Sequence, residues 1–206
     1  FWHNPLLAPE MFGAAAVAAA DRSKVPAVGQ LAPLDFPTIE RATLANGMKV
    51  YFARRTAIPA VSIRLSFDAG YSADPASALG TQSLLLSLMG EGTDKLDSTN
   101  FARARERLGA NIGAFADIDT TNFQLDAMTA NLGPSLKLLA DYVRRPALAP
   151  AELERVRGQQ LAAIGQELNN PNQIARRVMA AELYGAGNPY SVPPSGTGNA
   201  DVVKTL

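Results

Sequence analysis

The residue types that perform most enzyme chemistry are scarce in this sequence. It contains one histidine, His3, and no cysteine. The chain therefore cannot build a two-histidine or thiolate zinc site, a disulfide framework or a thiol nucleophile by itself. Two glycine-rich stretches, at 185–187 and 196–198, lack the strand-to-helix context and the following Lys-Ser/Thr of a phosphate-binding loop. Loop flexibility is the better interpretation of both.

The charged side chains offer weak candidates for acid–base chemistry. Asp117, Asp119 and Asp126 lie close together, but turns and strand ends explain aspartates at such positions. Three glutamates are expected to be solvated charges of one long helix: Glu152, Glu154 and Glu167. Four further residues are expected to form a polar helical face: Arg103, Arg105, Glu106 and Arg107. Residue types alone thus indicate no catalysis.

The composition is that of a globular protein with balanced charge. Of the 206 residues, 47% are hydrophobic and 18% are charged, which suits a folded chain with a sizeable core. The 19 Lys and Arg balance the 19 Asp and Glu, so we expect no nucleic-acid partner, which would require a basic face. The apolar run at 11–20 has the length of a signal-peptide core, but no basic region precedes it, and a short helix in a connecting segment is preferred. No run reaches the roughly 18 apolar residues of a membrane span.

Alternating hydrophobicity predicts strands in the middle of the chain. Residues 41–44 and 48–53 flank an Asn-Gly pair at 46–47, a strong signal for a hairpin in which both turn residues take positive φ. Residues 61–67 alternate strictly, which places the apolar residues Val61, Ile63, Leu65 and Phe67 on one face. Residues 111–117 and 120–128 indicate two further strands.

Helical patterns occupy much of the remaining chain. The first predicted helix covers 78–89, and the second, 98–108, has Ser98 and Thr99 as capping candidates. The others cover 132–143, 151–168 and 171–184, followed by a Gly/Pro-rich loop at 185–198. This order of elements implies an α+β fold, an antiparallel sheet with helices packed on one face. Residues 1–37, rich in Ala and Pro, are predicted to be a linker or arm before a module at 38–206.

A series of sequence blocks follows in a characteristic order: 43–50 (TLANGMKV), 59–70 (PAVSIRLSFDAG), 79–93 (LGTQSLLLSLMGEGT), 108–114 (LGANIGA), 131–141 (NLGPSLKLLAD), 150–157 (PAELERVR) and 183–190 (LYGAGNPY). This series resembles the insulinase/pitrilysin/mitochondrial-processing-peptidase family of zinc metallopeptidases. The resemblance covers roughly residues 38–206 and implies the two-layer α+β module of that family.

Active members of the family carry His-x-x-Glu-His on the helix after the third strand. The two histidines bind zinc, the glutamate is the base for the metal-bound water, and a glutamate on a later helix completes the metal shell. The resemblance places Ser83 and Ser87 at the histidine positions, Leu86 at the base and Ala163 at the later ligand, with Glu167 nearby. Serine hydroxyls are poor zinc ligands and leucine cannot move a proton. We therefore expect no catalytic residue and no metal in this chain, and an ordinary core helix at 78–89.

The family is built from paired homologous halves that close around an unfolded peptide, and one half commonly has lost its zinc. The resemblance implies that this chain belongs to a metal-free half, inactive alone, whose partner is a zinc-bearing half on the same chain or on a separate subunit. The arm at 1–37 would then connect from a preceding half, and the 206 residues would be the first of two modules. Bacterial relatives suggest a periplasmic or cell-envelope location.

The strand predicted at 111–117 could bind a peptide by strand addition, through backbone hydrogen bonds. The candidate residues are Asn111, Ile112, Gly113, Ala114, Phe115 and Ala116. The alternative is a strand protected by its neighbours. Two other functions stay open: a processing-peptidase-like scaffold subunit without a peptidase partner, and an independent peptide-binding module. An adjoining His-x-x-Glu-His half would favour the peptidase module, and its absence would favour the scaffold.

Overall fold

The computed structural model describes residue 29 and residues 36–206. The predicted arm at 1–37 therefore lies almost entirely outside the described residues. The chain divides into two compact units, 1–55 and 56–206. Each unit is described by itself below.

The first unit contains the predicted hairpin. Strands β1 (Ile39–Thr43) and β2 (Lys49–Ala53) pair antiparallel. Leu44 N donates to Met48 O at 2.9 Å, so the loop has three residues rather than the predicted two. Only Gly47 takes positive φ, at 85°, and the expectation that Asn46 does so as well is wrong. A three-residue hairpin loop needs a single left-handed residue at its end, which glycine supplies.

The second unit is built on a three-stranded antiparallel sheet, with β5 (Thr121–Met128) between β3 (Ala60–Phe67) and β4 (Asn111–Ala116). The alternation predicted for β3 is confirmed, because Ile63 and Leu65 pack into the core while the residues between them are exposed. Phe67 is 42% exposed and contacts Phe123 edge-on. The β4–β5 turn is held by Asp117, whose carboxylate accepts from the backbone N of Asp119 and of Thr120, so turn chemistry explains that aspartate as predicted.

Six α-helices complete the described part of the second unit: α1 (Thr81–Met89), α2 (Ser98–Leu108), α3 (Leu132–Arg144), α4 (Pro150–Leu168), α5 (Pro171–Tyr184) and α6 (Ala200–Val203). The cap of α2 is Asp97, whose Oδ1 accepts from Asn100 N at 2.8 Å, and not Ser98 or Thr99 as predicted. Helices α4 and α5 begin with proline, whose missing N–H costs nothing at a helix start. None of the described helices combines the length and apolar character that a bilayer crossing requires.

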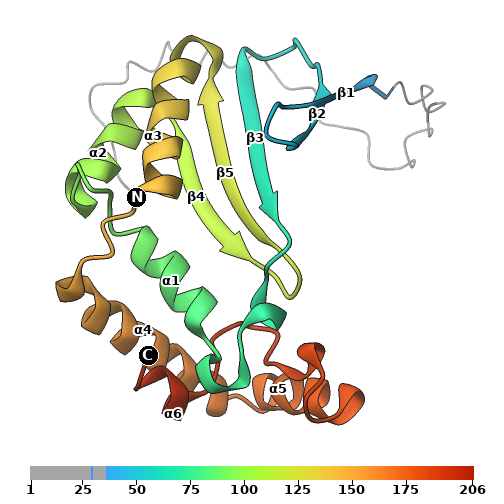
Figure 1. Cartoon of the computed structure of the whole chain (residues 1–206), viewed down its shortest axis with the longest axis vertical. Helices are drawn as coiled ribbons and strands as arrows, with labels where there is room; N and C mark the ends of the chain where they lie inside the picture. Colours follow the sequence, from blue (N-terminus) through green and yellow to red (C-terminus); the bar gives the residue numbers. More distant parts are fainter. Residues whose placement is uncertain (1–28, 30–35) are drawn as a thin grey trace, which may run out of the picture. The chain divides into compact units, whose positions relative to one another are not determined.

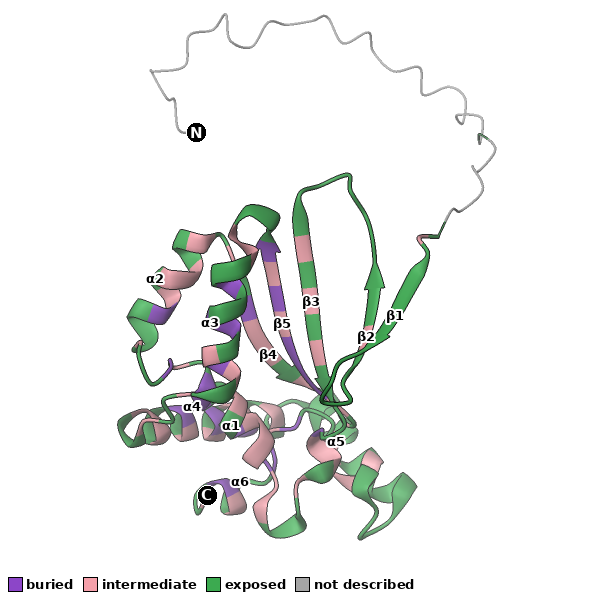
Figure 2. Cartoon of the chain, turned by 45° about the horizontal axis from the view of Figure 1, so that its top comes forward, coloured by how far each residue is buried: buried purple, intermediate pink, exposed green. Residues whose placement is uncertain are grey.

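Two apolar clusters hold the second unit together. The larger lies between the sheet and helices α2 and α3, which pack on one face (Figure 1); its buried members are Met89, Phe101, Ile112, Phe123, Leu125, Ala127, Leu138, Leu139 and Tyr142. The smaller joins α1 to α4 through Leu84, Leu88 and Val156. Figure 2 shows that β5, in the middle of the sheet, carries more buried residues than β3 at its edge. The α+β fold predicted from the sequence is confirmed.

Candidate functional site

Helix α1 carries three of the four residues that the resemblance places at catalytic positions, Ser83, Leu86 and Ser87. It begins at Thr81 rather than at Ala78, because Gly80 takes a left-handed backbone with φ of 101°. The Asp74 carboxylate accepts from Gly80 N at 2.9 Å and from Gln82 N at 3.2 Å, which satisfies N–H groups at the start of the helix. Tertiary contacts thus decide where this helix starts.

The three α1 positions have different surroundings. Ser83 is half-buried, and its Oγ donates to Gly196 O at 2.7 Å. Leu86 is half-buried and packs against the larger apolar cluster. Ser87 is exposed and lies one turn beyond Ser83, on the same side of the helix. The prediction that α1 packs as a core helix is supported by Leu84, Leu88 and Met89, all buried.

The fourth position, Ala163, lies on α4, which packs beside α1. It is half-buried between Gln160 and Glu167, three residues before it and four after it. Residues at these spacings share one face of a helix. Both neighbours bond the loop at 195–198, and Ser83 bonds the same loop. The fold therefore brings Ser83 of α1 and the two α4 neighbours of Ala163 together at this loop.

Three side chains hold three successive carbonyl oxygens of that loop. Ser83 of α1 binds Gly196 O at 2.7 Å, Gln160 of α4 binds Thr197 O at 2.8 Å, and Arg177 of α5 binds Gly198 O at 2.5 Å. We call Ser83, Gln160 and Arg177 the loop clamp. A Cβ on Gly196 would overlap the Tyr71 ring, and burial raises the pKa of the Tyr71 hydroxyl. The flexible loop predicted at 185–198 is thus tightly held at its end.

Glu167 is not the solvated helix charge that the sequence suggested. Its carboxylate pairs with Arg177 at 2.5 Å, and both side chains are only 15% exposed. It also accepts hydrogen bonds from Ser195 Oγ at 3.2 Å and Thr197 Oγ1 at 3.1 Å. Glu152 and Glu154, by contrast, pair with arginines on their own helix, and both glutamates are more exposed than Glu167. The Glu167 oxygens are therefore committed to protein partners.

The strand predicted to bind peptide is β4, which stands at one edge of the sheet. Its six residues are brought into one continuous strand, as predicted from the sequence. Arg105, expected on a polar helical face of α2, instead reaches the strand and donates from Nη1 to Ile112 O at 2.8 Å. Its guanidinium carbon lies 5.2 Å from the centre of the Phe101 ring. The start of the edge is therefore bonded by a side chain.

The sheet face opposite α2 and α3 is mostly polar, although it also carries the exposed ring of Phe115, which lies beside Arg64. We call it the polar sheet face, formed by Ser62, Arg64, Ser66, Asn111, Gly113, Phe115, Asn122, Gln124 and Asp126. Asp126 is its hub and accepts from Ser62 Oγ at 2.7 Å and from Gln124 Nε2 at 2.6 Å. These hydrogen bonds, that of Ser62 foremost, hold the pKa of Asp126 below its ordinary value, and the positive charge of Arg64 on the same face acts in the same direction.

Comparison with known proteins identifies the family. The profile of the insulinase family (peptidase family M16) matches residues 49–191. The chain belongs to peptidase family M16.

Relatives within M16 include peptidases and proteins named as lacking activity. The β subunit of the mitochondrial-processing peptidase of Rattus norvegicus is 25% identical over 73% of this chain and 31% of its own length. The non-peptidase homolog YmxG of Helicobacter pylori is 24% identical over 72% of this chain and 34% of its own. The crystal structure of a peptidase M16 inactive domain from Pseudomonas fluorescens matches with a TM-score of 0.76 and 29% identity, over 82% of this chain and 40% of that one. The chain thus spans about a third of the length of the curated relatives it matches.

The residues that the resemblance places at the M16 zinc positions do not fit the metal. Leu86 and Ala163 have no donor atom, and the Ser83 hydroxyl is engaged with Gly196 O. The Ser87 hydroxyl alone is left, and Zn²⁺ in proteins takes three or four thiolate, imidazole or carboxylate ligands. Across residues 36–206 no group of three His, Asp or Glu side chains is arranged to hold an ion. No catalytic step can be derived through zinc on this chain's own residues.

Sequence reasoning did not single out Gln160 and Arg177, and it assigned Arg105 to a polar helical face instead of to β4. Gln160 was not singled out, because an amide in a long helix has no local signal. Arg105 and Arg177 bond carbonyl oxygens 7 and 21 residues away along the chain. Hydrophobic periodicity, which reports on neighbours within a few residues, does not reveal such pairings.

Proposed function

We propose that this chain is a non-catalytic module of an M16 peptidase. It lines part of a chamber that encloses an unfolded peptide, and it packs against a homologous half that carries the zinc. The observation that carries the proposal is the loop clamp. Ser83, at a metal-ligand position, holds the backbone of the 195–198 loop, and Ala163 offers no donor atom. The similarity to an M16 inactive domain and to a non-peptidase homolog supports the same assignment.

The polar sheet face supports the role as a chamber wall. A surface that faces an enclosed aqueous space must stay hydrated and must not trap apolar side chains. Ser62, Arg64 and Ser66 of β3 are exposed. Asp126 adds a hydrogen-bonded charge. Such a face suits passage of unfolded segments of varied sequence.

Strand β4 supplies the second element of the proposal, a place where the backbone of a peptide can pair. An edge strand offers N–H and C=O groups that bind any extended segment regardless of side chains. The six residues 111–116 form this strand. Peptide contact would thus depend on the backbone and not on a specificity pocket.

The zinc is assigned to the partner half and not to this chain. Metal analysis of the purified protein tests this directly, and we expect less than one-tenth of an equivalent of zinc per chain, since carbon side chains and a committed hydroxyl have no affinity for it. One tightly held zinc per chain would overturn the assignment. The triple variant Ser83→His, Leu86→Glu, Ser87→His should still lack activity, because Ala163 gives no third protein ligand.

The decisive experiment is reconstitution with a zinc-bearing M16 half, encoded in the same reading frame or in an adjacent gene. Cleavage of an unfolded, fluorescence-quenched peptide is measured for each protein alone and for an equimolar mixture. We expect turnover by the mixture only, abolished by a zinc chelator. Chelator-sensitive cleavage by this chain alone would refute the proposal. A stable complex of the two proteins without turnover would instead favour the scaffold role.

A further inference from the structure

The outer edge of β4 is hydrogen-bonded by a side chain near its start. Helix α1 packs close to this strand, but within residues 36–206 no group outside the sheet bonds Ala114 or Ala116. Asp117 N donates to Thr120 O at 2.9 Å, so residue 117 faces β5. Hydrogen-bonding direction alternates along an antiparallel strand. The N–H and C=O groups of Ile112, Ala114 and Ala116 therefore point away from the sheet. These are the groups that an added strand would use.

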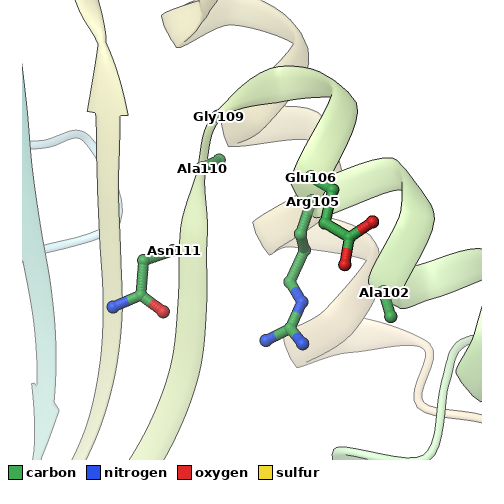
Figure 3. Close-up of a pocket in the computed structure, with 6 residues that line it drawn as sticks. All are labelled: Ala102, Arg105, Glu106, Gly109, Ala110 and Asn111. Carbon is green, nitrogen blue, oxygen red and sulfur yellow. The ribbon is translucent and has the colours of Figure 1, made fainter. Parts of the chain in front are cut away.

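Arg105 already occupies one of these groups, the carbonyl of Ile112. Its Nη1 donates to Ile112 O at 2.8 Å. Its Nε is buried and has no hydrogen-bond partner in the described part of the chain, so the side chain holds this position with one donor unsatisfied. The ring of Phe101, 5.2 Å from the guanidinium carbon, supports it. Figure 3 shows Arg105 reaching from α2 into the space beside the start of β4.

That space is a cleft of about 400 Å³ between the end of α2 and the start of β4. It is lined by Ala102, Arg105, Glu106, Gly109, Ala110 and Asn111 (Figure 3). A segment that pairs antiparallel with β4 runs from Ala116 toward Asn111, so its C-terminal end enters this cleft. There it meets the Arg105 guanidinium.

Within residues 36–206 no backbone or side-chain group outside the sheet bonds Ala114 or Ala116. On the outward edge, the N–H and C=O groups of Ala114 and Ala116 consequently have no hydrogen-bond partner outside the sheet within residues 36–206, whereas the carbonyl of Ile112 is bonded to Arg105. An extended segment can pair fully with Ala114 and Ala116. It can pair with Ile112 only if Arg105 swings away.

We propose that Arg105 is a gate on the β4 edge, which limits strand addition to a short extended polypeptide segment paired with Ala114 and Ala116. This inference rests on the proposed docking of peptide at β4. A short paired stretch gives weak, reversible binding, which suits a chamber through which peptide must pass. It also shields the edge against pairing with a second copy of this chain.

The test uses a fluorescein-labelled unstructured peptide of twelve residues and the full chain, with binding followed by anisotropy. The variant is Arg105→Met, which keeps the aliphatic stem over Phe101 and removes the donors. We expect roughly three- to tenfold tighter binding, because one competing hydrogen bond is removed. Arg107→Met, an exposed arginine two residues away on the same helix, is the matched control for lost charge and should leave the affinity unchanged.

A peptide N-methylated at alternate residues shows whether binding uses strand pairing, since methylation removes the N–H donors. Loss of binding with this peptide, together with tighter binding by Arg105→Met, supports the gate. Equal affinity of the wild type and Arg105→Met for the unmethylated peptide refutes the gate while docking at β4 stands. No binding by either protein, or equal binding of the N-methylated peptide, refutes docking at β4 itself.

Discussion

Replacing Ser83 by alanine tests the loop clamp most directly. The change removes the 2.7 Å hydrogen bond to Gly196 O and leaves that half-buried carbonyl without its partner. A hydrogen bond contributes about 0.5–1.5 kcal/mol net, and an unsatisfied carbonyl adds to the loss, so the clamp contact is worth about 1–2 kcal/mol. The higher helix propensity of alanine offsets about 0.5 kcal/mol of this.

The matched control is Ser87→Ala, one turn later on the same helix. Ser87 is exposed, and its side chain makes no hydrogen bond within residues 36–206. Ser87→Ala therefore gains the same helix propensity as Ser83→Ala and loses no hydrogen bond. We expect Ser83→Ala to lower the free energy of unfolding by about 1–2 kcal/mol relative to Ser87→Ala.

Urea unfolding followed by far-UV circular dichroism measures this difference, because the described helices all lie in residues 56–206. The slope of the free energy with urea should be the same for both variants. Equal unfolding free energies for Ser83→Ala and Ser87→Ala would refute the reasoning. Such a result would mean that Ser83 contributes no more to the fold than an exposed hydroxyl does.

Three further substitutions probe the same architecture. Glu167→Gln removes the carboxylate that pairs with the half-buried Arg177 and should lower the free energy of unfolding in urea by about 1–3 kcal/mol. Glu152→Gln, in an exposed pair with Arg155 on the same helix, should lower it by less than about 0.5 kcal/mol. Gly196 has φ of 70°, and a Cβ there would overlap the Tyr71 ring, whereas Gly185 has a similar φ of 78° and open space around it. Gly196→Ala should therefore lower the free energy of unfolding by about 1–3 kcal/mol more than Gly185→Ala does. Asp126 has a lowered pKa in the folded state, so its contribution is present above the unfolded pKa of about 3.9 and is lost as pH falls through the folded value. The free energy of unfolding is measured from pH 7 down to about pH 2 for the wild type and for Asp126→Asn. The difference between the two should decrease as the pH falls below about 3.9, and a difference that stays constant would contradict the lowered pKa of Asp126.

Local patterns predicted the strands and helices well, for a physical reason. The alternation along β3 reflects a sheet with one apolar and one polar face, and both faces are visible in the order of its residues. The aspartate at 117 was correctly explained as a turn residue, because an Asx turn is closed by backbone groups two and three residues away. Interactions between residues only a few positions apart can therefore be predicted from the sequence alone.

Element boundaries were predicted less well. Helix α1 begins three residues later than expected, because Asp74 and the close approach at Gly80 determine its start. Asp97 displaced Ser98 as the cap of α2. A cap depends on which side chain can reach a free N–H, and neighbouring candidates of similar type are equivalent in sequence.

The sequence by itself determined that this chain has one histidine and no cysteine in 206 residues, with serine, leucine and alanine where the M16 resemblance expects catalytic groups. Only the tertiary structure decided what those residues do instead. Ser83 lies 113 residues from the carbonyl it holds, and Gln160 lies 37 residues from its own. Pairings of that range depend on how helices and loops pack in space, and a chain's local order of polar and apolar residues carries no record of them.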